Sequence, residues 1–122
     1  MEKFKYINNP RSYNPENAFI AHLSGVRNKD ELLEQLNIKL KFPEYFGFNW
    51  DALLDVLCDF HWIKQKKVVL IHDDFPRLNE QELTIYLQIL FDSIQAWKGC
   101  EKHIIEVVFP ECAKYFTKHD EC

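Results

Sequence analysis

Residues 41–62 read KFPEYFGFNWDALLDVLCDFHW, a stretch that combines a chain reversal, a helix start and a row of acids along one helix face. Pro43 disfavours the helical conformation at the residue before it, and Gly47 permits backbone angles that other residues resist. These signals predict an ordered loop over residues 42–48. The rest of the chain is interpreted as support for this loop and for the helix after it.

A helix is predicted directly after the loop. Asn49 is a preferred N-cap residue, so the helix is expected to begin at Trp50 and to continue to about Phe60. At about 100° per residue, its apolar side chains gather on one side. They are Leu53, Val56, Leu57 and Phe60, with Trp50 and Leu54 at the margin.

Three aspartates, Asp51, Asp55 and Asp59, follow one another at intervals of four residues on the opposite side of this helix. Neighbouring carboxylates at this spacing repel by about 0.2–0.5 kcal/mol, and Asp59 would face the negative end of the helix dipole. Folding alone does not require this arrangement, whereas a partner that carries cations would. The alternative is a solvated acidic face beside a buried apolar one.

The run PEYFGFNWDALLDVL, residues 43–57, resembles the signature of the barstar family, small intracellular inhibitors of secreted ribonucleases. Members of that family read approximately PEYYGxNxDALWDxL in this block. The motif is fairly specific, because a proline, an aromatic pair, a glycine, an asparagine and two aspartates must coincide in register. The resemblance implies that the acidic helix and the aromatic loop block the active site of a cognate basic ribonuclease.

The resemblance also implies roles for single residues. Asp55 is the central carboxylate that takes the place of an RNA phosphate, Asp51 flanks it, and Tyr45 stacks in or over the ribonuclease cleft. A tyrosine ring with its hydroxyl group is typical of an interface anchor, whereas Phe46 is either a partner contact or a plug over the core. The predicted partner-binding residues are Tyr45, Phe46, Gly47, Asn49, Trp50, Asp51, Leu54, Asp55, Asp59 and Phe60.

Some of these positions depart from the best-known family member. Phe46 stands where a second tyrosine is usual, Leu54 where a tryptophan is common, and Asp59 where that inhibitor has glycine. The family inhibitor supplies a further acidic contact from its later long helix, and the resemblance places that contact equally well at Asp92 or at Ser93. These differences leave the blocking mechanism intact and leave the identity of the nuclease or toxin open.

Length and composition indicate one globular domain. The 122 residues are 47% hydrophobic and 15% aromatic with only three glycines, which describes a chain that can bury a core. We expect a single barstar-like domain over residues 1–122, with an irregular N-terminal extension at 1–17 and a C-terminal extension at 110–122. The aromatic side chains of the N-terminal extension indicate that it packs against the body of the domain.

Charge and hydropathy exclude other classes of protein. A formal net charge of −4 argues against nucleic-acid binding, and the lysine-rich run at 64–67 is interpreted as a turn. Residues 1–10 lack the apolar core of a signal peptide, and no run approaches the ~20 apolar residues that cross a bilayer. We therefore expect a cytoplasmic protein without membrane contact, whose four cysteines remain thiols.

Strand-like and helical segments alternate along the chain. Residues 18–25, 67–72 and 103–109 are predicted strands, and the continuous apolar run of the second is typical of a strand buried on both faces. The order β–α–α–β–α–β predicts an α/β fold with a small three-stranded parallel sheet and right-handed crossovers. The resemblance adds a spatial strand order of 2-1-3 with helices packed around the sheet.

Two Cys-x-x-His pairs, Cys58/His61 and Cys100/His103, have side chains that bind zinc in other proteins. One pair follows a predicted helix and the other precedes a predicted strand, and nothing in the sequence brings them together. We interpret the four residues as buried or incidental thiols and imidazoles and predict no metal site.

His72, Asp73 and Asp74 lie at the end of a predicted parallel strand, where open α/β sheets usually place their chemistry. No glycine-rich phosphate loop or nucleophile elbow accompanies them, so no catalytic residue, cofactor or enzyme activity is predicted. The favoured function is an inhibitor or immunity protein for a cognate extracellular or toxin ribonuclease. The alternatives are an interaction module for a non-nuclease basic partner and a small hydrolase.

Overall fold

The computed structural model describes residues 4–113, and a four-stranded parallel sheet forms its centre. The strands are β1 (Lys5–Ile7), β2 (Ala18–Leu23), β3 (Lys67–His72) and β4 (Ile104–Pro110). The helices are α1 (Lys29–Leu40), α2 (Trp50–Leu57) and α3 (Glu80–Trp97), with two short 3-10 turns, η1 (Pro10–Ser12) and η2 (Glu111–Ala113). The predicted α/β class with a parallel sheet is confirmed.

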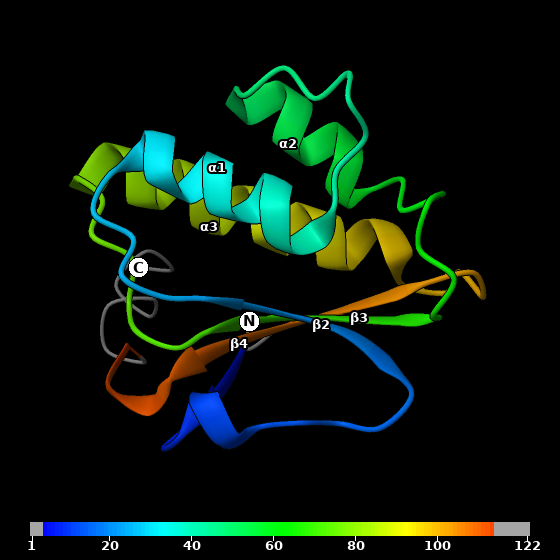
Figure 1. Cartoon of the computed structure of the whole chain (residues 1–122), viewed down its shortest axis with the longest axis horizontal. Helices are drawn as coiled ribbons and strands as arrows, with labels where there is room; N and C mark the ends of the chain where they lie inside the picture. The colour runs from blue at the N-terminus through cyan, green and yellow to red at the C-terminus, as the bar shows by residue number, and fades with distance from the viewer. Residues whose placement is uncertain (1–3, 114–122) are drawn as a thin grey trace.

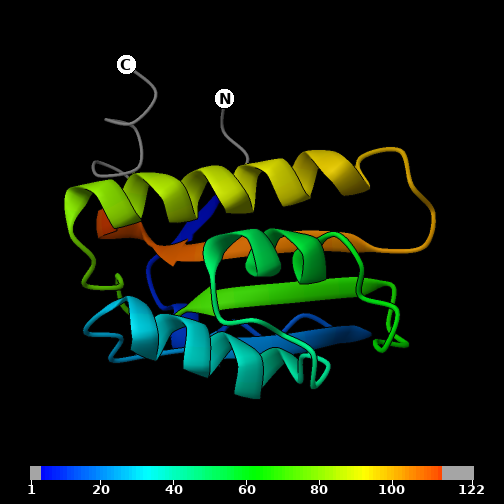
Figure 2. The same ribbon diagram turned by 90° about the horizontal axis from the view of Figure 1, so that it is seen from above.

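The predicted strand order is wrong. The three expected strands correspond to β2, β3 and β4, and the sheet order β1-β4-β3-β2 places them in the sequence 1-2-3 instead of 2-1-3. Val68 of β3 pairs with Phe19 of β2 on one side and with Ile105 of β4 on the other. From β2 to β3 to β4, each strand is added on the same side of the one before it. Successive right-handed crossovers therefore put all three helices on one face, as Figures 1 and 2 show.

The chain forms three layers. Figure 1 shows the helices above the sheet and the N-terminal segment below it, and Figure 2 shows α3 along β4, α1 along β2 and α2 between them. Alternate residues of β3 belong to different apolar clusters, Val68 and Leu70 to the core under the helices and Val69 and Ile71 to a smaller cluster. The prediction that this strand is buried on both faces is confirmed.

The N-terminal extension is more regular than predicted. β1 pairs in parallel with β4 and adds the fourth strand. Its three residues are too few to give a recognisable sequence pattern. Ile7 and Tyr13 pack on the smaller cluster, and the rings of Phe4 and Tyr6 contact that of Phe109 at 5.5 and 6.4 Å. The expected packing against the body is confirmed. Residues 114–122 lie outside the described chain, and the single domain over 1–122 stays a prediction.

Asparagine side chains start the three helices. The Oδ1 atoms of Asn28, Asn49 and Asn79 each accept a hydrogen bond from the backbone amide three residues later, at 2.9, 2.8 and 2.8 Å. This bond satisfies an amide that has no partner inside the helix. The leucines of α1 are buried, and Gly99 follows the end of α3 with φ +81°.

Candidate partner-binding surface

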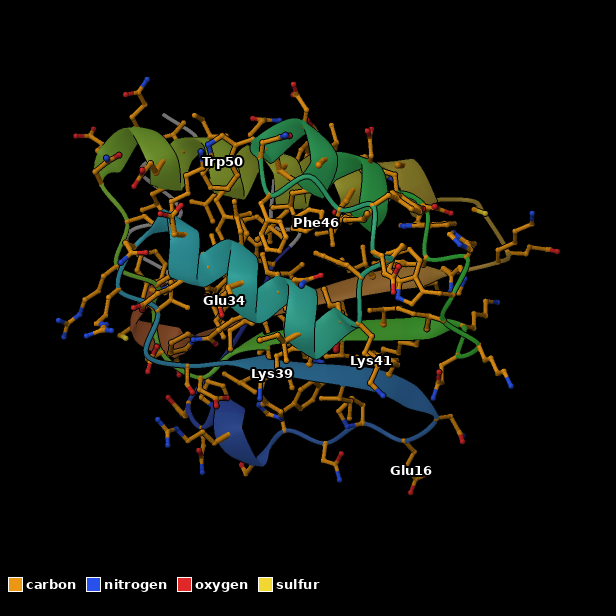
Figure 3. The ribbon with its side chains drawn as sticks, turned by 45° about the horizontal axis from the view of Figure 1, so that its top comes forward. Glu16, Glu34, Lys39, Lys41, Phe46 and Trp50 are labelled. Carbon is orange, nitrogen blue, oxygen red and sulfur yellow. The ribbon has the colours of Figure 1, made fainter. Side chains whose placement is uncertain are left out.

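The loop before α2 exposes Tyr45 and buries Phe46. Tyr45 is 68% exposed and Phe46 only 5%. The Phe46 ring lies 4.7 Å from that of Phe42 and 4.8 Å from that of Phe48, and Figure 3 shows it between α1 and α2. Tyr45 thus has the predicted external position. Phe46 is the core plug, and its inclusion among the partner contacts is wrong.

The unusual backbone of this loop belongs to Phe48 instead of Gly47. The φ angle of Phe48 is +52°, in the left-handed region that few non-glycine residues adopt, whereas φ of Gly47 is not positive. A Cβ atom at Gly47 would lie 3.3 Å from Asn49 Nδ2 and 3.6 Å from the Cβ of Ala52. The reason predicted for this glycine is therefore wrong. It leaves room for the helix cap.

The beginning of α2 is held from two sides. Asn49 caps the helix with its Oδ1 atom, and its Nδ2 atom donates to the backbone oxygen of Gly47 at 3.3 Å. The half-buried Trp50 ring lies 6.3 Å from the ring of Tyr86, and Lys29 Nζ lies 5.0 Å from the Trp50 ring. These contacts join loop, α1 and α3 to the first turn of α2, so the turn that carries Asp51 is firmly positioned.

Asp51 and Asp55 are exposed on the outer face of α2. Among residues 4–113, neither carboxylate has a lysine, arginine or histidine within ion-pair distance. Leu53 is fully buried, and Leu54 packs partly buried against the core, at the margin as predicted. The helix therefore offers two unneutralised carboxylates, which form strong, short hydrogen bonds with cationic donors.

Asp59 does not belong to this acidic row. α2 ends at Leu57, so Asp59 lies beyond the helix and the predicted row of three is wrong. Its Oδ2 atom accepts a hydrogen bond from His61 Nδ1 at 2.8 Å and one from the Tyr45 hydroxyl group at 3.4 Å. Desolvation and the Asp59 charge raise the pKa of Tyr45, so that hydroxyl group remains a donor.

Phe60 is a core residue. Its side chain is fully buried, its φ angle is +51°, and its ring stacks on that of Trp97 with the centroids 5.8 Å apart. The prediction of a partner contact at Phe60 is wrong. The helix stops before this residue because a left-handed backbone turns the ring against α3.

α3 contributes a carboxylate beside α2. Asp92 is exposed and accepts a hydrogen bond from Gln88 Nε2 at 2.9 Å, whereas Ser93 is fully buried and donates to a backbone oxygen of α3 at 2.8 Å. Burial and then the charges of Asp55 and Asp92 raise the pKa of Cys58, which places both carboxylates near this thiol. Of the two residues that the sequence left open, Asp92 is the accessible one.

The two Cys-x-x-His pairs meet, contrary to expectation. Both line one open hollow of about 690 Å³, together with Asp59, Ile63, Lys64, Trp97 and Lys102. His61 Nδ1 is bonded to Asp59, and His103 Nδ1 donates to a backbone oxygen at 3.0 Å. Within the described part of the chain, no group of three or more histidine, cysteine, aspartate or glutamate side chains is placed to hold a metal ion. The raised pKa keeps Cys58 a thiol, which is a weak nucleophile.

The residues at the end of β3 are engaged in structural hydrogen bonds. His72 is fully buried, with Nδ1 2.9 Å from the backbone oxygen of Val108 and Nε2 2.7 Å from the Tyr86 hydroxyl oxygen. Since a carbonyl oxygen only accepts, Nδ1 carries the proton and Nε2 accepts from Tyr86. Burial lowers the pKa of His72 to about 4. Asp73 pairs with His22 at 2.7 Å, and the two carboxylate oxygens of Asp74 accept from the Gly25 amide at 3.0 and 3.1 Å, so all three residues at the end of β3 are engaged.

Two features of this region were missed. Phe48 is 51% exposed, yet the alternation of aromatic residues in FGF does not reveal whether Phe46 or Phe48 faces solvent. The spacing of two residues between Asp59 and His61 is compatible with their pairing. The pairing was not predicted because a helix was expected to continue through this stretch.

A family comparison agrees with this geometry. Residues 17–110 match the model of the family described as Barstar (barnase inhibitor), a segment that contains β2, β3, β4 and the three helices. A comparison with curated proteins found no match. No helix in residues 4–113 is long and apolar enough to cross a membrane. The chain belongs to the barstar family, whose members inhibit barnase-type ribonucleases and are not enzymes.

Proposed function

We propose that the protein inhibits a cognate basic ribonuclease by occupying its active site. Asp51 and Asp55 take the positions of RNA phosphates, and Tyr45 stacks in or over the cleft. One observation carries the proposal: both carboxylates are exposed and lack an ion-pair partner in residues 4–113, on a helix whose opposite face is buried. Folding leaves these charges available for a partner.

The proposed partner is basic because it binds RNA. A ribonuclease must bind the RNA backbone, so its cleft carries cations that attract carboxylates as well as phosphates. Because α2 is held by its cap and its buried face, the inhibitor loses little conformational freedom when it binds. Asp92 adds a third exposed charge, on the helix α3 that packs against α2. We further propose a cytoplasmic location, where cysteines remain thiols.

The test is capture of the nuclease. The immobilised protein is exposed to barnase and to extracellular proteins of the source organism, and retained proteins are assayed for RNA cleavage and its suppression. Asp55→Ala is expected to weaken the complex by about 2–5 kcal/mol, the range for buried interfacial charge pairs, for which barnase–barstar is itself the reference case. Glu16→Gln removes an exposed charge elsewhere and is the matched control.

Two results would contradict this function. Equal affinity of Asp55→Ala and wild type for the captured ribonuclease would rule out the role of Asp55. Capture of a basic protein that does not cleave RNA would instead support an interaction module for a non-nuclease partner.

A further inference from the structure

An open hollow of about 450 Å³ lies on α1, outside the surface described above. We call it the α1 groove, and its lining residues are Asp30, Leu33, Glu34, Asn37, Ile38 and Phe48. The five residues from α1 recur at helical spacing, so they share one face of that helix. The sixth, Phe48, belongs to the loop before α2.

The groove has apolar walls that folding does not require. Ile38 is 60% exposed and Phe48 51%, although burial of such a side chain stabilises by about 1.5–3 kcal/mol. The Phe48 ring leans on that of Phe46, 4.8 Å away, and is thereby kept beside α1. Two large apolar side chains thus flank one hollow and remain available to a partner.

The groove also carries negative charge. Asp30 and Glu34 are exposed, and in the described segment neither forms an ion pair or a side-chain hydrogen bond. The neighbouring cation Lys29 lies over the Trp50 ring at 5.0 Å. Figure 3 shows Lys39 and Lys41 at the end of α1 that is farther from Trp50. An apolar hollow with free carboxylates is complementary to a long basic side chain.

We propose that the α1 groove receives an arginine side chain of the cognate ribonuclease, an inference that rests on the proposed function. The alkyl stem packs between Ile38 and Phe48, and the guanidinium group pairs with Glu34 and stacks on the Phe48 ring. The groove adjoins the proposed surface, because Phe48 lies between Gly47 and Asn49. A partner bound to Asp51 and Tyr45 therefore also covers the α1 groove.

Glu34→Gln and Phe48→Asn test the groove. Glutamine keeps the shape of glutamate without its charge, and asparagine removes the ring while tolerating the left-handed backbone. The probe is the ribonuclease retained by the immobilised wild-type protein. Each variant is expected to raise Kd about tenfold, mainly through faster dissociation. The increase in Kd of the double variant should be smaller than the product of the two single increases, because both residues contact the same arginine.

Glu16→Gln is the control, since Figure 3 shows Glu16 beyond β2 from α1. Dissociation rates of Glu34→Gln and Phe48→Asn equal to that of the control would overturn the groove inference. Asp55→Ala, measured in parallel, separates the two proposals. If Asp55→Ala also binds like wild type, the proposed function itself fails, whereas weakening by Asp55→Ala alone rejects only the groove. Should Phe48→Asn unfold at a lower temperature, the result for Glu34→Gln decides, because within residues 4–113 the exposed Glu34 side chain forms no ion pair.

Discussion

The hydroxyl group of Tyr13 donates a hydrogen bond of 2.6 Å to the carboxylate of Glu106, which joins residues 93 positions apart. Tyr13 precedes the segment that matches the family, and Glu106 lies on β4 within it. Lys5 Nζ donates to the same Tyr13 oxygen at 3.1 Å, and Lys5 and Lys67 lie 3.8 and 3.6 Å from Glu106. The N-terminal extension is thereby fastened to the face of the sheet that the helices leave open.

Tyr13→Phe is expected to lower the free energy of unfolding by about 1–2 kcal/mol, because a partly buried bond to a charged group is lost. Urea denaturation measures the change. Tyr45→Phe removes an exposed hydroxyl group at 3.4 Å from its partner and should cost much less. Equal losses for the two variants would show that the Tyr13 bond contributes no special stability. Ribonuclease affinity should not change in Tyr13→Phe.

Substitutions at Asp92 and Ser93 should separate effects on ribonuclease binding from effects on stability. Asp92→Asn is expected to weaken the complex and to leave stability unchanged, because Asp92 is exposed on the helix that packs against α2. Ser93→Ala should lower stability by about 0.5–1.5 kcal/mol with little effect on binding, because its buried hydroxyl group bonds a backbone oxygen. Calorimetric titration and thermal unfolding of both variants test this assignment. The reverse pattern would assign the further contact to Ser93.

The association rate should fall as salt rises. Attraction between exposed carboxylates and a basic cleft is screened beyond about 8 Å at physiological ionic strength. Stopped-flow association between about 50 and 500 mM NaCl measures the slope. The double variant Asp51→Asn, Asp55→Asn should give a shallower slope than wild type. Parallel slopes would mean that other charges steer the encounter.

Stability should decrease below neutral pH because of His72. Its folded pKa of about 4 lies below the ordinary 6.5, so between these values the unfolded chain binds the proton more readily. The contribution is complete above pH 6.5 and is lost as the pH falls toward 4, by up to about 3 kcal/mol. Urea denaturation at several pH values measures this loss. His72→Gln, which does not titrate, should give a flatter profile, and an unchanged slope would exclude His72 as the cause.

Local signals in the sequence predicted much of the fold correctly. Asn49 marks the start of α2 because a cap involves only the next three residues. The exposure of Asp51 and Asp55 followed from helical periodicity. The helix predicted from the same periodicity was wrong at Asp59 and Phe60, because no residue near Leu57 signals that the helix ends there.

By itself, the sequence determined the class of fold, the start of α2 and the family to which its acidic block belongs, because caps, periodicity and motif order are properties of neighbouring residues. Only the tertiary structure decided that Phe46 and Phe60 face inward, that Asp59 pairs with His61 and that β3 lies between β2 and β4. Each of these outcomes depends on contacts between segments distant along the chain. Phe60, for example, turns inward to stack on Trp97 of α3.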